Sequence, residues 1–141
     1  EAIICVENIA GKSPEPLNYK NIPACTYTQP EIASTGFTEK AAIEAGYEVK
    51  VGKFPLTASG KASAAGEKDG FIKVIFDAKY GELLGVHMIG ASVTEIVGGA
   101  VIARNLEITG EELIKTIFPH PTISESLMEA AAAAYGEAIH I

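Results

Sequence analysis

The residues best suited to chemistry lie in one short segment, FPHPTISE, at positions 118–125. His120 stands between Pro119 and Pro121, so its backbone has few allowed conformations and its imidazole is held in a restricted position. Glu125 falls in the first turn of the helix predicted to follow, which could place its carboxylate within hydrogen-bond reach of the ring. Such a carboxylate fixes the tautomer of the ring and favours the imidazolium. The segment therefore predicts a His–Glu acid/base pair.

Other interpretations of these residues remain open on the sequence alone. Thr122-x-x-Glu125 has the spacing of a capping box, in which Glu125 would close the helix N-terminus, although a carboxylate has enough acceptor positions for both roles. His120 could likewise be a structural turn residue, and His87 and His140 are predicted to be structural or exposed. The histidine spacings match no metal motif and no nucleophile elbow is present, which disfavours a metal site and a peptidase.

The elements that must hold the pair follow from the pattern of apolar residues. Strands are predicted first in the chain, over residues 24–28, 31–36, 47–54, 71–78 and 83–90. The main helices come later, and helices are predicted over residues 38–45, from 92 onward, over 110–118 and over 125–136, with a loop over 55–70. This order predicts an α+β fold, an antiparallel β-sheet with helices packed on one face.

Two of the predicted helices begin with a capping box, Ser92-x-x-Glu95 and Thr109-x-x-Glu112. The first of these helices also contains Gly98 and Gly99, which cost about 1 kcal/mol each relative to alanine. Glycines in a helix usually permit the close approach of another backbone. The sequence leaves open whether that backbone belongs to the same domain or to a second subunit.

The organisation of the chain is that of one domain with an N-terminal extension. Residues 1–12 are interpreted as the end of a helix closed by Gly11, and residues 13–22 as a Pro- and Asn-rich connector. Residues 23–141 are then the domain itself. Because the chain lacks an initiator Met and a basic n-region, we expect a piece of a longer protein without a signal peptide.

Charge and cysteine usage exclude several classes of function. The chain has 11 Lys and Arg against 18 Asp and Glu, a net charge of −7, which disfavours nucleic acid and anionic membranes as partners. No apolar segment has the length of a membrane span. Cys5 and Cys25 match neither C-x-x-C nor a zinc pattern. We therefore expect unpaired thiols in a reducing compartment, the cytoplasm.

The segment FPHPTISESLMEAAAAAYGEAIHI closely resembles the C-terminus of the dihydrolipoamide dehydrogenases, in the pyridine nucleotide-disulfide oxidoreductase family. IPACTYTQPEIASTGFTEKAA resembles the opening of the family's dimerisation domain, and residues 1–12 resemble the end of its FAD-binding domain. The resemblance covers roughly residues 20–141, and H-P-T-x-S-E is its most specific motif. Glutathione and trypanothione reductases share that motif but differ in the tail. Mercuric reductases carry a C-terminal cysteine pair that is absent here.

This resemblance implies that His120 is the active-site base, which takes a proton from dihydrolipoamide, and that Glu125 orients it. It also implies that the His120–Pro121 peptide is cis and lies near the flavin of the partner subunit, so that catalysis requires a homodimer. In the complete enzyme FAD and then NAD⁺ receive the reducing equivalents. The implied macromolecular partners are the lipoyl domains of 2-oxo acid dehydrogenase complexes or of the glycine cleavage system.

The chain lacks the motifs that would hold those cofactors. It has no G-x-G-x-x-G motif, and its two cysteines are not spaced like the redox disulfide of the family. We therefore expect the 141 residues alone to bind no FAD and to be inactive. The alternatives are a stand-alone dimerisation or scaffold module, and the same domain of another disulfide reductase such as glutathione reductase.

Overall fold

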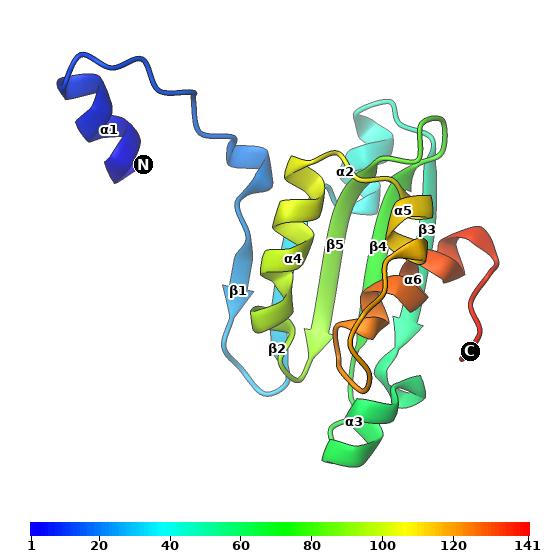
Figure 1. Cartoon of the computed structure of the whole chain (residues 1–141). Coiled ribbons are helices and arrows are strands. Elements are labelled where there is room, and N and C mark those ends of the chain that lie inside the picture. Colours follow the sequence, from blue (N-terminus) through cyan, green and yellow to red (C-terminus); the bar gives the residue numbers. More distant parts are fainter.

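A computed structural model describes all residues, 1–141, and contains one five-stranded antiparallel sheet (Figure 1). The strands lie in the order β1-β2-β5-β4-β3, so β5 is central, and every neighbouring pair is antiparallel. Their bounds are β1 Ala24–Thr26, β2 Glu31–Gly36, β3 Val49–Pro55, β4 Phe71–Asp77 and β5 Leu83–Gly90. Each lies within two residues of a predicted strand, and β1 and β3 are the ones whose bounds differ most.

Three helices, α4, α5 and α6, cover one face of this sheet (Figure 1). The arrangement confirms the predicted α+β fold with helices packed on one face. None of the helices combines the length and apolar character that crossing a bilayer would require. The helices are α1 Ala2–Ile9, α2 Glu39–Glu44, α3 Gly60–Ala65, α4 Val93–Asn105, α5 Gly110–Lys115 and α6 Glu125–Tyr135, with short 3₁₀ turns η1 Tyr19–Asn21 and η2 Leu56–Ala58.

The main core lies between the sheet and these three helices. Alternate residues of β4, Ile72, Val74 and Phe76, point into it because successive side chains of a strand face opposite sides. A smaller cluster of Ala42, Ile75 and Leu84 lies on the other side of the sheet, where α2 packs. The second face is therefore covered by a helix only at one end.

The predicted loop over residues 55–70 was wrong in part, since it contains η2 and α3. Ser59 caps α3 by accepting a hydrogen bond from the Ala62 N–H, and Gly66 ends the helix in the left-handed region, with φ +74°. A helix of six residues is too short to show an apolar period. Only its two caps could have revealed it.

The two predicted capping boxes had different outcomes. The box of Thr109 and Glu112 is confirmed, with both reciprocal hydrogen bonds present. The box of Ser92 is wrong, because Ser92 is left-handed and its side chain makes no cap hydrogen bond. Glu31 of β2 takes its place and accepts hydrogen bonds from the N–H and hydroxyl of Thr94. A tertiary contact therefore replaced the local cap.

Helix α1 lies away from the sheet, at the far end of an extended segment (Figure 1). Three of its four large apolar side chains, Ile3, Val6 and Ile9, are exposed. This arrangement is compatible with the proposed boundaries, in which residues 1–12 belong to another domain and 13–22 connect it to 23–141. That division stays a prediction.

Close packing of β3 against α6 fixes the position of the helix that follows His120. A Cβ atom on Gly52 of β3 would overlap the carbonyl oxygen of Ala130 and lie 2.6 Å from the backbone nitrogen of Ala134. Both of these atoms are backbone atoms of α6, so no side-chain rotation could relieve the contact. A side chain at Gly52 is therefore incompatible with the position of α6.

We expect Gly52→Ala to lower the free energy of unfolding by about 1–3 kcal/mol, the usual cost of overpacking. Gly60→Ala is the matched control, because a Cβ there meets nothing within 4 Å and alanine favours the helix. Urea denaturation of both variants measures the difference. Equal stabilities of the two variants would contradict the close approach of β3 and α6.

Candidate functional site

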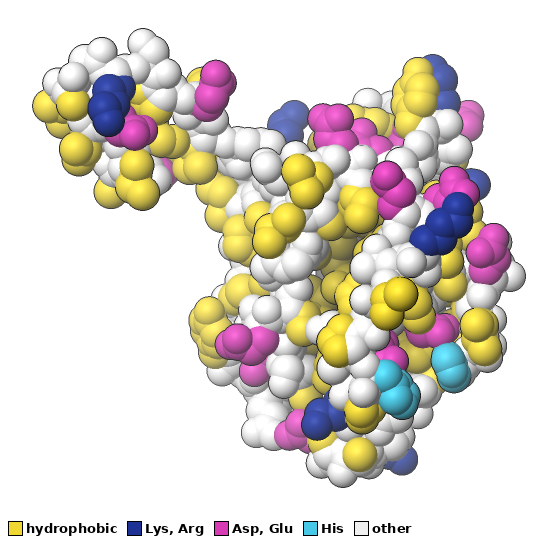
Figure 2. Space-filling view, viewed as in Figure 1, with side chains coloured by type: hydrophobic (Ala, Val, Ile, Leu, Met, Phe, Trp, Pro, Cys, Tyr) yellow, Lys and Arg dark blue, Asp and Glu magenta, His cyan; other side chains and the backbone are white.

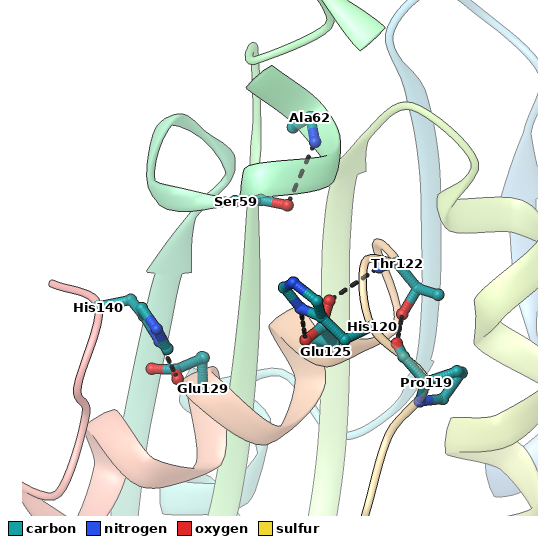
Figure 3. A network of polar contacts seen from close by, with 8 residues as sticks. All are labelled: Ser59, Ala62, Pro119, His120, Thr122, Glu125, Glu129 and His140. Atoms are coloured by element: carbon teal, nitrogen blue, oxygen red, sulfur yellow. Dashed lines mark hydrogen bonds and ion pairs between the residues drawn. The ribbon is translucent and has the colours of Figure 1, made fainter. Parts of the chain in front are cut away.

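The segment between α5 and α6 carries His120 and is ordered by its own polar groups (Figure 3). The Thr122 hydroxyl donates a hydrogen bond of 2.7 Å to the carbonyl oxygen of Pro119. The His120–Pro121 peptide is cis, as the resemblance implied. His120 therefore lies in a tight turn whose two ends are joined through Thr122.

The Glu125 carboxylate joins this turn to the start of α6. Its Oε1 lies 2.8 Å from Nδ1 of His120, and its Oε2 accepts a hydrogen bond of 2.8 Å from the Thr122 N–H. The expected capping box is thus half formed, because the Thr122 hydroxyl bonds to Pro119 instead of the Glu125 N–H. Glu125 holds both the histidine ring and the backbone of the turn, so the two interpretations of this residue coexist.

The contact determines which nitrogen of His120 is free. A carboxylate only accepts hydrogen bonds, so Nδ1 carries the proton and Nε2 is left as an acceptor in the neutral ring. The His120 side chain is 79% exposed, whereas that of Glu125 is 26% exposed. The arrangement leaves an oriented imidazole accessible at the surface and keeps its orienting carboxylate partly covered.

Opposing effects act on the pKa of Glu125. Burial alone raises this pKa, whereas the hydrogen bond from Thr122, the hydrogen bond and charge of His120, and the charge of His140 lower it. The net effect places the pKa below its ordinary value of 4.5. Glu125 is therefore a carboxylate anion at neutral pH.

A second histidine–carboxylate pair lies beside the first (Figure 3). His140 Nδ1 lies 2.6 Å from Oε1 of Glu129, and both pairs line a cavity of about 280 Å³. His140 is exposed, as predicted, but Glu129 was missed by the sequence analysis. The four-residue spacing of Glu125 and Glu129, which places both on one helix face, was the available signal.

The remaining candidate residues lie outside the site. The His87 Nε2 bonds to the carbonyl oxygen of Phe37 on the face of the sheet opposite the main core, which makes it structural. Cys5 and Cys25 are unpaired, as expected. No group of three or more His, Cys, Asp or Glu residues is arranged to hold a metal ion.

Gly98 and Gly99 lie on the outer surface of α4. A Cβ atom at either position would meet nothing within 4 Å, so neither glycine serves a contact within the domain. Ile102 and Leu106, one and two turns further along the same stripe, are also exposed, and Figure 2 shows hydrophobic side chains over α4. Of the two alternatives, a contact inside the domain is excluded and a contact with another molecule remains.

The family follows from comparison with known proteins. Residues 22–131 match the family model of the pyridine nucleotide-disulphide oxidoreductase dimerisation domain. The chain belongs to this family. It is 53% identical over 141 residues to dihydrolipoyl dehydrogenase of Zymomonas mobilis and 50% identical over 140 residues to that of Bacillus subtilis. Each alignment covers 99% of this chain but 30% of the relative.

Two solved structures share the fold. The flavoprotein disulfide reductase RclA of Escherichia coli superposes with a TM-score of 0.85 and 25% identity, over 92% of this chain and 30% of that chain. LpdA of Mycobacterium tuberculosis superposes with a TM-score of 0.83 and 24% identity, over 91% of this chain and 28% of that one. The fold is therefore that of the dimerisation domain in disulfide reductases, and the chain spans about 30% of such proteins.

The lowered pKa of Glu125 predicts the pH dependence of its contribution to stability. Because the pKa in the folded state lies below 4.5, this contribution is fully present above that pH and is lost as the pH falls through the lowered pKa. Glu125→Gln should therefore reduce the free energy of unfolding at about pH 7 and have a diminishing effect towards about pH 2. Urea denaturation at several pH values measures this.

Glu44→Gln provides the control. Glu44 forms an exposed ion pair with Lys40 at 3.7 Å, and such a pair contributes less than about 1 kcal/mol at any pH. A loss for Glu125→Gln that did not depend on pH would show that the carboxylate charge adds no stability.

Proposed function

We propose that this domain supplies His120 as the acid/base group, oriented by Glu125, in the NAD-dependent oxidation of dihydrolipoamide by a flavoprotein homodimer. The observation that carries the proposal is the contact between His120 and Glu125, which leaves Nε2 of an exposed ring free. Relatives at 50–53% identity named dihydrolipoyl dehydrogenase give the substrate class. The activity is that of the complete protein, of which these residues are a part.

The chemistry assigned to this chain is a proton transfer. Nε2 of His120 accepts the proton of a dihydrolipoamide thiol, and the Glu125 carboxylate stabilises the imidazolium that results. The thiolate so formed is the nucleophile for disulfide exchange with a redox-active disulfide elsewhere in the protein. FAD and NAD⁺, when bound, accept the two electrons that the dithiol loses. His120 then releases its proton to solvent, which accounts for the H⁺ formed when a dithiol and NAD⁺ become a disulfide and NADH, and the residue is ready for the next turnover.

The surroundings of His120 fit a role in trans, close to a flavin held by the partner subunit. Ile117, three residues before the histidine, is 95% exposed, and Pro121 is exposed as well. An apolar side chain in this position is suited to a contact with another protein surface. His120 and Pro121 are the residues of this chain that would lie near the flavin.

We infer that the complete protein is a homodimer in which α4 contributes to the subunit contact. The family description of a dimerisation domain supports the homodimer, and the exposed stripe of Gly98, Gly99, Ile102 and Leu106 supports the position of the subunit contact on α4.

Lipoyl domains of a 2-oxo acid dehydrogenase complex or of the glycine cleavage system are the proposed partners. The unpaired Cys5 and Cys25 support the cytoplasm as the proposed location.

In the flavoprotein that contains this domain, His120→Gln should lower kcat/KM for dihydrolipoamide by about 10²–10⁴-fold, the usual contribution of a positioned base. Glu125→Ala should have a smaller effect and shift the pH profile of kcat/KM. His87→Gln is the matched control, since His87 lies on the opposite face of the sheet. Turnover near wild type for His120→Gln would favour a scaffold role of this domain over a catalytic one.

A charge in the exposed stripe of α4 should disrupt the dimer. We expect Ile102→Glu to convert the complete flavoprotein from dimer to monomer at about micromolar concentration, because it places an unpaired carboxylate in an apolar contact. Light scattering gives the mass. Ile43→Glu, at an exposed apolar position of α2 behind the sheet, should leave the dimer intact. Equal masses for the two variants would place the contact elsewhere than α4.

A further inference from the structure

The second pair on α6 involves a buried carboxylate. The side chain of Glu129 is only 5% exposed, and both of its oxygens accept hydrogen bonds from residues 137–141, here called the tail. Oε1 lies 2.6 Å from Nδ1 of His140, and Oε2 lies 3.3 Å from the backbone nitrogen of Ile139. The hydrogen bonds that the Glu129 side chain accepts thus come entirely from the tail.

A carboxylate removed from water requires partners, because an unpaired buried charge is strongly destabilising. The tail, in turn, has exposed apolar side chains, Ile139 and Ile141, and its other backbone hydrogen bond to α6 runs from the Glu137 N–H to the carbonyl oxygen of Ala132. The position of the tail and the charge of Glu129 therefore depend on each other. Release of the tail would leave the carboxylate without its partners.

The two pairs occupy one cavity and share one face of α6 (Figure 3). Four titratable groups line this cavity: His120, Glu125, Glu129 and His140. The other lining residues, from β3, η2, α3 and α6, do not titrate; they are Phe54, Ala58, Ser59, Gly60, Ser126 and Met128. No lysine or arginine lines the cavity. The two imidazoles are therefore the only lining groups that can carry a positive charge.

We propose that Glu129 and His140 are positioning residues for the His120–Glu125 pair: Glu129 fixes the tail, and the tail places the His140 imidazolium where it stabilises the Glu125 anion. The effect of His140 on the pKa of Glu125 has the required sign, since its charge lowers that pKa. The effect is smaller than those of burial, Thr122 and His120. The consequence for catalysis rests on the proposed function, whereas the coupling between the pairs does not.

The titration of Glu125 in the 141-residue chain tests the coupling directly. The carboxylate ¹³C signal of Glu125 reports its protonation by NMR as the pH is lowered. His140→Gln keeps a donor for Glu129 and removes the cation, so the pKa of Glu125 should rise by about 0.3 unit, the value for unit charges roughly 10 Å apart in water. His140→Arg keeps the positive charge and should restore a value close to wild type.

Two further variants separate the charge from the fold. Glu129→Ala should accelerate hydrogen exchange at the Ile139 amide by about tenfold or more, as loss of a bond to a charged acceptor requires. His87→Gln removes an imidazole remote from the cavity and should leave the titration of Glu125 unchanged. Together these variants assign tail anchoring to Glu129 and the electrostatic effect to His140.

An unchanged pKa of Glu125 in His140→Gln, or an equal rise in His140→Arg, would overturn the proposal and reduce the second pair to an anchor for the tail. Unaltered exchange at Ile139 in Glu129→Ala would overturn the anchoring as well. Neither result depends on turnover. If His120→Gln retained activity while His140→Gln shifted the titration, the proposed function would fail and the coupling would stand.

Discussion

The contact between α6 and β3 is the constraint on which the site depends. Gly52 lets the backbone of α6 lie directly against the strand, and Ala130 and Ala131 of α6 are fully buried there. Small side chains on both elements remove the freedom of the helix to slide or rotate. Because Glu125 is the first residue of α6, the position of its carboxylate is set by packing contacts one to two turns away.

A rigid helix of this kind determines where its polar groups point. Glu125 and Glu129 are one turn apart, and both carboxylates emerge on the same side of α6. Each accepts a hydrogen bond from a histidine that lies outside the helix, one before it and one after it. The alanine-rich sequence that follows thus serves two purposes, since alanine favours the helix and also permits the close approach to β3.

Much of this arrangement was predictable from the sequence because it depends on local signals. The strands follow from alternation, α6 from its helix formers, and the His120–Glu125 contact from the two prolines and a short turn. The cap of α4 was not predictable, because Glu31 replaces Ser92 across the sheet. The spacing of Glu125 and Glu129 indicates one helix face, but the contact between Glu129 and His140 was not predictable, since nothing in their spacing shows that the tail folds back onto α6.

The exposure of His120 is compatible with the proposed division of the site between two molecules. The imidazole of His120 is 79% exposed, so this chain shields little of it from water, and Glu125 is the side chain that hydrogen-bonds to the ring. Exposed polar contacts are weakened by competing water, and a surface that covers the ring would strengthen the pair. Under the proposed function, a second surface that covers His120 would therefore complete the site. The exposed Ile117, three residues before His120, and the open stripe on α4 are the features of this chain suited to such a contact.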